Sequence, residues 1–226
     1  MADTFTIEPI ARIESDFAGK FGIPRQAGLV NALEARIVFE KKYRSADALR
    51  GIEGYSHLWL IWQFSANLRE GWSPTVRPPR LGGNERMGVF ATRSPFRPNA
   101  LGLSCVRLVR VENDPRRGGT LIVAGADLMD GTPIFDIKPY VAYADAHPDA
   151  RSGFAAAPPA AIDVVIPPAL LARVPEGKRE ALRGVLAGDP RPQYQHDEKR
   201  VYAMDFAGLN IKFTVSGDKL TVVGIA

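Results

Sequence analysis

The sequence has very little cysteine and histidine. Cys105 is the single cysteine among 226 residues, so no disulfide can form within the chain, and this fits a reducing compartment. The cysteine lies in an alternating apolar stretch, which favours a buried structural role over a nucleophilic one. The three histidines, His57, His147 and His196, show no metal-ligand spacing. We therefore expect no metal site.

Long apolar runs are also missing. No stretch approaches the ~18 residues that a membrane-spanning helix needs. The N-terminal segment MADTFTIEPIARIES carries acidic residues early and lacks the apolar core of a signal peptide. We therefore expect a cytoplasmic protein with no membrane partner. The chain also lacks βαβ alternation and a G-x-G-x-x-G after a predicted strand, which argues against a Rossmann nucleotide-binding fold.

What the sequence does contain is a concentration of arginine. The segment from residue 69 to residue 97 holds six arginines and two acids, so its formal charge is 6 − 2 = +4, equal to that of the whole chain. A solvated surface is one interpretation. Glycines and prolines interleaved with the arginines favour another, an anion-binding wall, because a guanidinium group grips carboxylates and phosphates bidentately. The pI near 9.3 is compatible with nucleic-acid binding.

The stretch Gly82–Ser104, GGNERMGVFATRSPFRPNALGLS, is the most unusual part of this segment. Its glycines permit backbone conformations that other residues avoid, and its prolines fix φ and remove donors. The pattern predicts a short strand at Met87–Thr92 that runs into a rigid turn at Ser94–Ala100. Such a turn would hold Arg93 and Arg97 in set directions.

The periodicity predicts a mainly β protein. Residues 1–145 are expected to form an antiparallel β-barrel, residues 146–160 a linker rich in alanine, proline and aspartate, and residues 161–226 a small α+β domain. The strands expected in the first unit are Thr4–Ile13, Glu34–Phe39, Tyr55–Phe64, Met87–Thr92, Leu103–Val111, Thr120–Asp127 and Thr132–Ile137. The second unit is expected to contain strand Ile162–Ile166, helix Glu176–Ala187 and strands Arg200–Phe206, Leu209–Val215 and Lys219–Ile225.

Six motifs, in this order along the chain, resemble one known family. They are PRQAGLV (24–30), GYSHLWLIWQF (54–64), TVRPPRLGGN (75–84), GVFATRSPFRPNALGLS (88–104), DLMDGTPIFDIKPY (127–140) and DPRPQY (189–194). Together they resemble the TsaA-like, or TrmO-like, proteins. The resemblance implies an S-adenosylmethionine-dependent tRNA methyltransferase that modifies N6 of the threonylcarbamoyladenosine immediately 3′ of the anticodon. It also implies a homodimer.

The resemblance also implies a cofactor pocket. Arg93 is the candidate for the cofactor's carboxylate, and Asp127 and Asp130 are candidates for its amino group or ribose. The remaining cofactor candidates are Pro24, Arg25, Gln26, Ser65, Ala66, Leu103, Leu128 and Met129. The family often has a His-Gln pair where this chain has Ser65-Ala66, so backbone contacts are expected there. Without the resemblance, Asp127-x-x-Asp130-Gly131 is more simply interpreted as a hairpin turn.

The sequence gives weaker indications of which residues would contact the nucleoside that accepts the methyl group. Asn99, Asp136 and Tyr140 are candidates for accepting a hydrogen from the target nitrogen, although Asp136 is equally interpreted as an ion-pair partner of Lys138. Arg97 is a candidate for the carboxylate of the modified nucleoside. Arg80, Arg86, Arg191 and Tyr194 are candidates for tRNA contact, with a domain-docking turn as the alternative for the last two.

Two other functions fit the same residues. The chain could methylate a different acceptor, or it could bind S-adenosylmethionine or RNA without transferring a methyl group. The Ser65-Ala66 departure keeps both open, whereas the intact DPRPQY motif in the small domain favours tRNA methylation.

Overall fold

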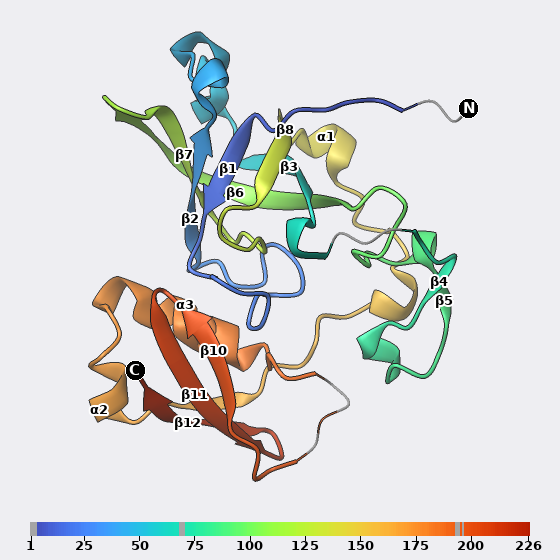
Figure 1. Cartoon of the computed structure of the whole chain (residues 1–226), viewed down its shortest axis with the longest axis vertical. Coiled ribbons are helices and arrows are strands. Elements are labelled where there is room, and N and C mark those ends of the chain that lie inside the picture. The colour runs from blue at the N-terminus through green and yellow to red at the C-terminus, as the bar shows by residue number, and fades with distance from the viewer. Residues whose placement is uncertain (1–3, 68–70, 193–194, 196) are drawn as a thin grey trace.

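The computed structural model describes residues 4–67, 71–192, 195 and 197–226. Its largest element is an antiparallel sheet whose strands are hydrogen-bonded in the order β1-β2-β7-β6-β3-β8 (Figure 1). Their bounds are β1 Ala11–Glu14, β2 Glu34–Phe39, β3 His57–Gln63, β6 Leu101–Asp114, β7 Gly118–Ala124 and β8 Pro133–Pro139. The sheet closes into a barrel where β1 pairs with β8, through Ala11–Ile134 and Arg12–Pro133. The mainly β, antiparallel prediction is confirmed.

Alternation along the strands builds the core of this barrel. In β3, Leu58, Leu60 and Trp62 are buried while the residues between them are partly exposed, as expected for side chains that point alternately to the two faces. These three pack with buried side chains of the other strands, among them Ile37 and Leu121. The register of β3 against β6 places Trp62 opposite Gly102, near one end of the barrel.

The C-terminal part of the chain forms a second sheet, with strand order β10-β11-β12-β9, packed against a helix (Figure 1). Its elements are β9 Asp163–Val165, α2 Pro168–Leu171, α3 Glu176–Ala187, β10 Tyr202–Phe206, β11 Leu209–Ser216 and β12 Lys219–Ile225. Strand β9 runs parallel to β12, and the other pairings are antiparallel. Helix α3 buries Ala181, Leu182, Val185 and Leu186, the apolar stripe that the sequence predicts.

Residues 16–33 connect β1 to β2 and belong to both units. Phe17, Val30 and Leu33 are buried in the hydrophobic core of the second sheet, although they lie far from it in sequence. Asp16 forms an ion pair with Lys178 of α3 (2.6 Å). The hydrophobic cores therefore divide the chain differently from the sequence-based limits of residues 145 and 161, because this N-terminal loop forms part of the C-terminal core.

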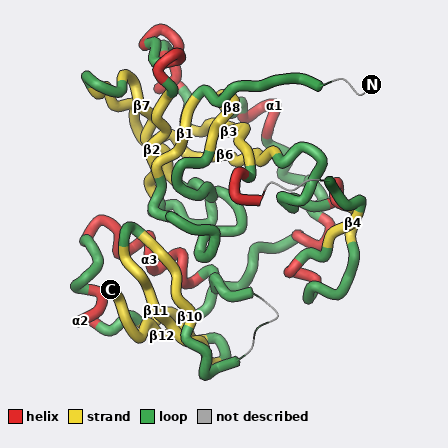
Figure 2. Tube along the Cα trace, viewed as in Figure 1, coloured by secondary structure: helices red, strands yellow, loops and turns green. Residues whose placement is uncertain are grey.

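Shorter elements complete the described chain (Figure 2). A two-stranded sheet joins β4 Thr75–Val76 to β5 Met87–Gly88, and α1 spans Ala142–Asp145. Short 3-10 helices occupy Lys41–Tyr43, Ala46–Leu49, Ile52–Gly54, Ser65–Asn67, Pro79–Leu81, Val89–Ala91 and Gly153–Ala155. Within the described residues, no helix is long and apolar enough to cross a membrane.

Several strand predictions were too long, and two of them exceed the observed strand by four residues or more. The strand expected at Thr4–Ile13 begins only at Ala11, since the exposed residues 4–8 pair with no strand in the part of the chain that the structure describes. The strand expected at Met87–Thr92 ends at Gly88, because its partner β4 is only two residues long. The chain then turns into the 3-10 helix Val89–Ala91, and the Thr92 hydroxyl donates back to the Val89 carbonyl (2.9 Å).

Candidate functional site

A cavity of about 770 Å³ opens at one end of the barrel. Its walls come from the end of β3, the start of β6, the loop after β7, the β1–β2 loop and the turn that follows the 3-10 helix Val89–Ala91. Nine of the predicted cofactor residues line it: Pro24, Arg25, Gln26, Ser65, Ala66, Arg93, Leu103, Asp127 and Met129. Arg97 and Asn99 line it as well. The fold therefore brings together residues that lie up to about a hundred positions apart in sequence.

A chain of hydrogen bonds supports the barrel side of the cavity. The Trp62 indole Nε1 donates to Ser104 Oγ (3.0 Å), and Ser104 Oγ donates to Asp127 Oδ1 (2.6 Å). Gly102 makes this arrangement sterically feasible, because a Cβ built there would lie 2.3 Å from Trp62 Cε2. The flat indole ring thus covers a backbone position where no side chain fits, and its N–H fixes the serine that orients Asp127.

Among the described residues, Asp127 is the carboxyl group that lines the cavity. Burial raises its pKa, while the Ser104 hydroxyl, the backbone N–H of Ala27 and the charge of Arg93 act in the opposite direction. The carboxylate therefore retains partners for its charge within a largely dehydrated position. Such a group can bind a cation or hydroxyl donors of a ligand strongly, because water competes little for it.

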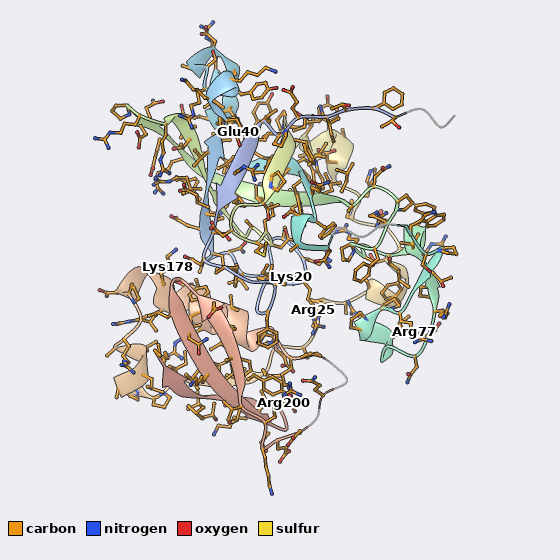
Figure 3. The ribbon with its side chains drawn as sticks, viewed as in Figure 1. Lys20, Arg25, Glu40, Arg77, Lys178 and Arg200 are labelled. Carbon is orange, nitrogen blue, oxygen red and sulfur yellow. The ribbon has the colours of Figure 1, made fainter. Side chains whose placement is uncertain are left out.

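The opposite wall is made of loops. Arg93 Nη1 donates to Gln26 Oε1 (2.5 Å), which links the arginine-rich turn to the β1–β2 loop. Lys20 Nζ donates to the Ala66 carbonyl (2.8 Å), and Arg25 Nη2 donates to the Arg191 carbonyl of the second unit (3.2 Å). Figure 3 shows Lys20 and Arg25 in the region between the barrel and the C-terminal sheet. Three cations therefore border the cavity on this side.

Arg97 has a structural task in addition to its place in the cavity. Its Nη1 donates to the carbonyls of Thr92 (3.0 Å) and Ser94 (3.4 Å), so the guanidinium group closes its own turn. The residues of the predicted turn, Ser94–Ala100, form neither helix nor strand. The Asn99 carbonyl accepts a hydrogen bond from the Leu101 backbone N–H (2.6 Å), and its side chain lines the cavity.

Four of the predicted cofactor and catalytic residues do not line this cavity. Leu128 is buried in the barrel core, and Asp130 caps the backbone, since its Oδ1 accepts from the Ser15 N–H (2.9 Å). Asp136 pairs with Lys138 (2.9 Å), as the alternative interpretation of that motif stated. Tyr140 packs against the rings of His57 and Trp59. Asp136 and Tyr140 lie on and just after β8, which runs along β3 away from the cavity, whereas Met129 and Thr132 before this strand still line the cavity.

Three residues predicted to contact RNA, Arg80, Arg86 and Arg191, also do not line the cavity. The exposed Arg80 donates to the Ala157 carbonyl and Arg86 to Thr75 Oγ1 (3.2 Å). Arg191 forms two hydrogen bonds to the Asp189 carboxylate (2.9 and 2.8 Å), so its charge is already paired within its own turn. Tyr194 lies outside the described residues.

Several lining residues were missed by the sequence interpretation. Lys20, Trp62, Gln63, Phe64, Asn67 and Thr132 line the cavity, and Ser104 supports it from behind. Lys20 and Asn67 lie outside the quoted motifs, and the others lie inside them without a charge or turn signal of their own. Trp62 and Gln63 read as ordinary strand residues. The alternation of β3 could have indicated that Trp62 faces inward, but only the register of β3 with β6 places it over Gly102. Among the described residues, no group of three or more His, Cys, Asp or Glu side chains could hold a metal ion.

Two family models match the chain. The tRNA-methyltransferase O N-terminal domain matches residues 12–146, and the TrmO C-terminal domain matches residues 159–226. The tRNA (adenine(37)-N6)-methyltransferase of Escherichia coli K12 is 42% identical over 94% of each chain. A Pseudomonas aeruginosa PAO1 protein, provisionally named an S-adenosylmethionine-dependent methyltransferase, is 45% identical over 86% of this chain and 85% of its own.

The fold agrees with a solved structure of the same family. The crystal structure of TrmO from Pseudomonas aeruginosa superposes with a TM-score of 0.81 at 35% sequence identity. The match covers 99% of both chains, so it includes the barrel, the segment that follows it and the C-terminal sheet.

Proposed function

Because this chain belongs to the tRNA-methyltransferase O family, we propose that it transfers a methyl group from S-adenosylmethionine to N6 of a tRNA adenosine next to the anticodon. The more specific part of the proposal is that this adenosine carries the threonylcarbamoyl group. The observation that carries the proposal is the convergence of Arg93, Gln26 and Asp127 on one cavity from three separate segments.

The residues of the cavity fit the cofactor. Its volume of about 770 Å³ lies in the range of small-molecule sites. Arg93 would pair with the carboxylate of the methionine moiety, and Asp127 would accept hydrogens from its ammonium group or from ribose hydroxyls. Leu103 and Met129 offer apolar surface to the adenine. Lys20 donates a hydrogen bond to the Ala66 carbonyl. Where the family often has a His-Gln pair, this chain has Ser65-Ala66, and its backbone groups would contact the cofactor there.

The chain's own residues would act mainly by positioning. S-adenosylmethionine, when bound, supplies an electrophilic methyl group on a sulfonium ion. The exocyclic nitrogen of adenine is a weak nucleophile, so holding it in line and at close distance provides a large share of the rate. The Asn99 side chain, at the cavity wall, would accept a hydrogen bond from this nitrogen through its amide oxygen, and the proton that the nitrogen loses on methylation would pass to solvent. No charged general base is required in this arrangement.

The remaining surface would guide the tRNA. Arg80 and Arg86 are exposed on the segment around the β4–β5 sheet, and the chain's pI near 9.3 favours approach to a polyanion. Arg97 would donate hydrogen bonds to the carboxylate of the threonylcarbamoyl group through the N–H groups that do not bond to its own turn. We further propose that the C-terminal unit contributes to tRNA contact and that two chains assemble as a homodimer.

The test is nucleoside mass spectrometry. The purified protein is incubated with S-adenosylmethionine and two tRNA preparations, one carrying threonylcarbamoyladenosine and one carrying unmodified adenosine at the same position. A new methyl group on the modified nucleoside alone supports the full proposal. Methylation of both preparations removes the threonylcarbamoyl requirement. Tight cofactor binding without transfer to either tRNA points to a different acceptor.

Arg93→Ala isolates the cofactor assignment. Calorimetry should show that S-adenosylmethionine binding falls below detection, since the cofactor's carboxylate loses its cationic partner. Arg107→Ala is a matched control, because Arg107 is an exposed arginine of β6 that does not line the cavity. Wild-type affinity in Arg93→Ala would remove Arg93 from the binding site.

A further inference from the structure

A second cavity of about 850 Å³ adjoins the first. The two share a wall that includes Gln63, Asn67 and Asn99. Beyond this wall the second cavity is bounded by Trp72 and by the extended N-terminal residues around Phe5. A ligand in the second cavity would therefore lie next to a ligand in the first, separated only by these shared side chains.

The shared wall carries three carboxamide groups. Within the described part of the chain, the side-chain amides of Gln63, Asn67 and Asn99 form no hydrogen bond to another residue. Each amide offers both a donor and an acceptor, the pair that matches the amino group and adjacent ring nitrogen of adenine. Three unused carboxamides between two cavities thus form a polar edge suited to a nucleobase.

Aromatic rings flank this edge. Trp72 is 55% exposed, and its ring centroid lies 6.1 Å from that of Phe90, which lines the first cavity. Phe5, across the second cavity, is 85% exposed. Trp72 and Phe90 together offer exposed ring surface beside the carboxamides, and nucleobases stack on aromatic rings whatever their sequence.

We propose that the second cavity receives the adenine of the acceptor nucleotide, stacked on Trp72, with its amino edge read by the carboxamides of the shared wall. This inference rests on the proposed function, since it assigns the acceptor side of the same site. It places the acceptor nitrogen at the boundary between the cavities, on the side that faces the first. Gln63 and Asn67 join Asn99 as acceptor-binding residues in this assignment.

Polarity favours a nucleobase over a second copy of the chain as the occupant. A protein interface that covered this cavity would bury three carboxamides, and each unpaired amide would cost the desolvation of its polar atoms. An adenine satisfies such groups through its own donors and acceptors. The neighbouring Arg97, shared by both cavities, adds a positive charge that suits a nucleotide.

The test measures binding of a fluorescein-labelled anticodon stem-loop RNA, so it does not depend on catalysis. Trp72→Ala should weaken RNA binding about tenfold, Trp72→Phe should restore most of it, and the affinity for S-adenosylmethionine should stay unchanged. Tyr143→Ala is the control, because Tyr143 is an even more exposed aromatic residue that lines neither cavity.

A second RNA tests the edge contacts. A stem-loop with purine in place of the target adenine lacks the 6-amino group, and the wild type should bind it several-fold more weakly than the adenine RNA. In Asn67→Leu this difference should shrink, whereas in Trp72→Ala both RNAs should weaken together.

Three results would overturn the assignment: unchanged RNA affinity in Trp72→Ala, a loss of cofactor affinity instead, or a change of oligomeric state in light scattering. The last would identify this face as a contact between two chains. Failure of the proposed function would look different, because the wild type would then show no methyl transfer although the RNA-binding comparisons remained measurable.

Discussion

The two walls of the cofactor cavity are built in different ways. On the barrel side, Trp62, Ser104 and Asp127 are connected by hydrogen bonds and backed by a sheet with fixed register. On the loop side, residues 20–26 belong to no helix or strand, and Figure 1 shows their loop between the barrel and the C-terminal sheet.

The loop wall takes its position from packing against the C-terminal unit. Asp16 pairs with Lys178, the Ala207 N–H donates to the Asp16 carbonyl (2.8 Å), and Val30 packs where Gly184 of α3 has no side chain. The barrel also holds the loop, through the Gly28 N–H and the Gly125 carbonyl (2.8 Å). The barrel wall therefore depends on local sheet geometry, whereas the loop wall depends largely on contacts with the distant second unit.

Gly102→Ala should have the largest effect on stability and cofactor affinity, because it adds a side chain within the barrel wall itself. The new Cβ would lie 2.3 Å from the Trp62 ring, so the indole must move and lose its bond to Ser104. Overpacking and the lost hydrogen bond together should lower the free energy of unfolding by about 3 kcal/mol, measured by urea denaturation.

Cofactor binding should also disappear in Gly102→Ala, because Asp127 loses its orientation. Gly88→Ala is the control, since a Cβ at Gly88 meets nothing within 4 Å. Stability and affinity equal to those of wild type in Gly102→Ala would show that the barrel wall is more adaptable than its geometry implies.

Gly184→Ala tests the loop wall from a distance. Its Cβ would lie 2.6 Å from Val30 Cγ1, so the β1–β2 loop must shift. We expect a loss of about 1–2 kcal/mol in unfolding free energy and weaker S-adenosylmethionine binding by calorimetry. Gly177→Ala on the same helix meets nothing within 4 Å and should be neutral or slightly stabilising.

The matching rescue is Val30→Ala. In that background the added methyl group of Gly184→Ala has room, so the further loss of stability should vanish. If Gly184→Ala lowers stability but leaves cofactor affinity intact, the loop wall is held by the barrel alone and the comparison between the walls fails.

The pKa of Asp127 gives a pH test of the barrel wall. Burial raises this pKa, so protonation should begin at a higher pH than for an ordinary aspartate, and cofactor affinity should fall as the pH decreases through that range. The dependence should flatten in Asp127→Asn. Calorimetric titrations at several pH values measure both, and an equal pH dependence in wild type and variant would assign it to another group.

Asp127 affects folding stability with the opposite pH dependence to its effect on cofactor affinity. Between the ordinary and the raised pKa, the folded state binds more protons than the unfolded state, so the Asp127 contribution to stability decreases as pH rises through this window. This carboxylate therefore costs folding energy at neutral pH. A loss of folding free energy of this kind is typical of a carboxylate that is buried for binding.

Arg80→Ala should have the smallest effect, since it lies outside both walls. If Arg80 contacts a phosphate, its loss should reduce the slope of log affinity against log salt for tRNA by about one unit and leave cofactor binding unchanged. Filter binding at several salt concentrations measures the slope. An unchanged slope would mean that Arg80 serves only its hydrogen bond to the Ala157 carbonyl.

The sequence predicted the regular elements well where alternation was clear. Strands Glu34–Phe39 and Lys219–Ile225 and helix Glu176–Ala187 have the predicted bounds, because their side-chain pattern and their partners agree. The strands expected at Thr4–Ile13 and Met87–Thr92 were too long, because alternation indicates a tendency to extend but not whether a partner strand is present.

The candidate site was predictable only in part. Arg93, Gln26 and Asp127 were identified through motifs, and the structure brings them to one cavity. Asp130 and Asp136 belonged to the same motif and yet serve the local backbone and an ion pair. Which carboxylate of a motif faces the cavity depends on the path of the chain after β7, and a motif does not specify that path.

The sequence by itself determined the antiparallel strands, the apolar face of α3 and the arginine-rich turn, because each follows from side-chain spacing or from local glycine and proline chemistry. Tertiary structure decided that Trp62 covers Gly102, that the β1–β2 loop joins the C-terminal core, and that two cavities share one carboxamide wall. These outcomes depend on contacts between residues far apart along the chain, and such contacts are fixed by strand register and packing.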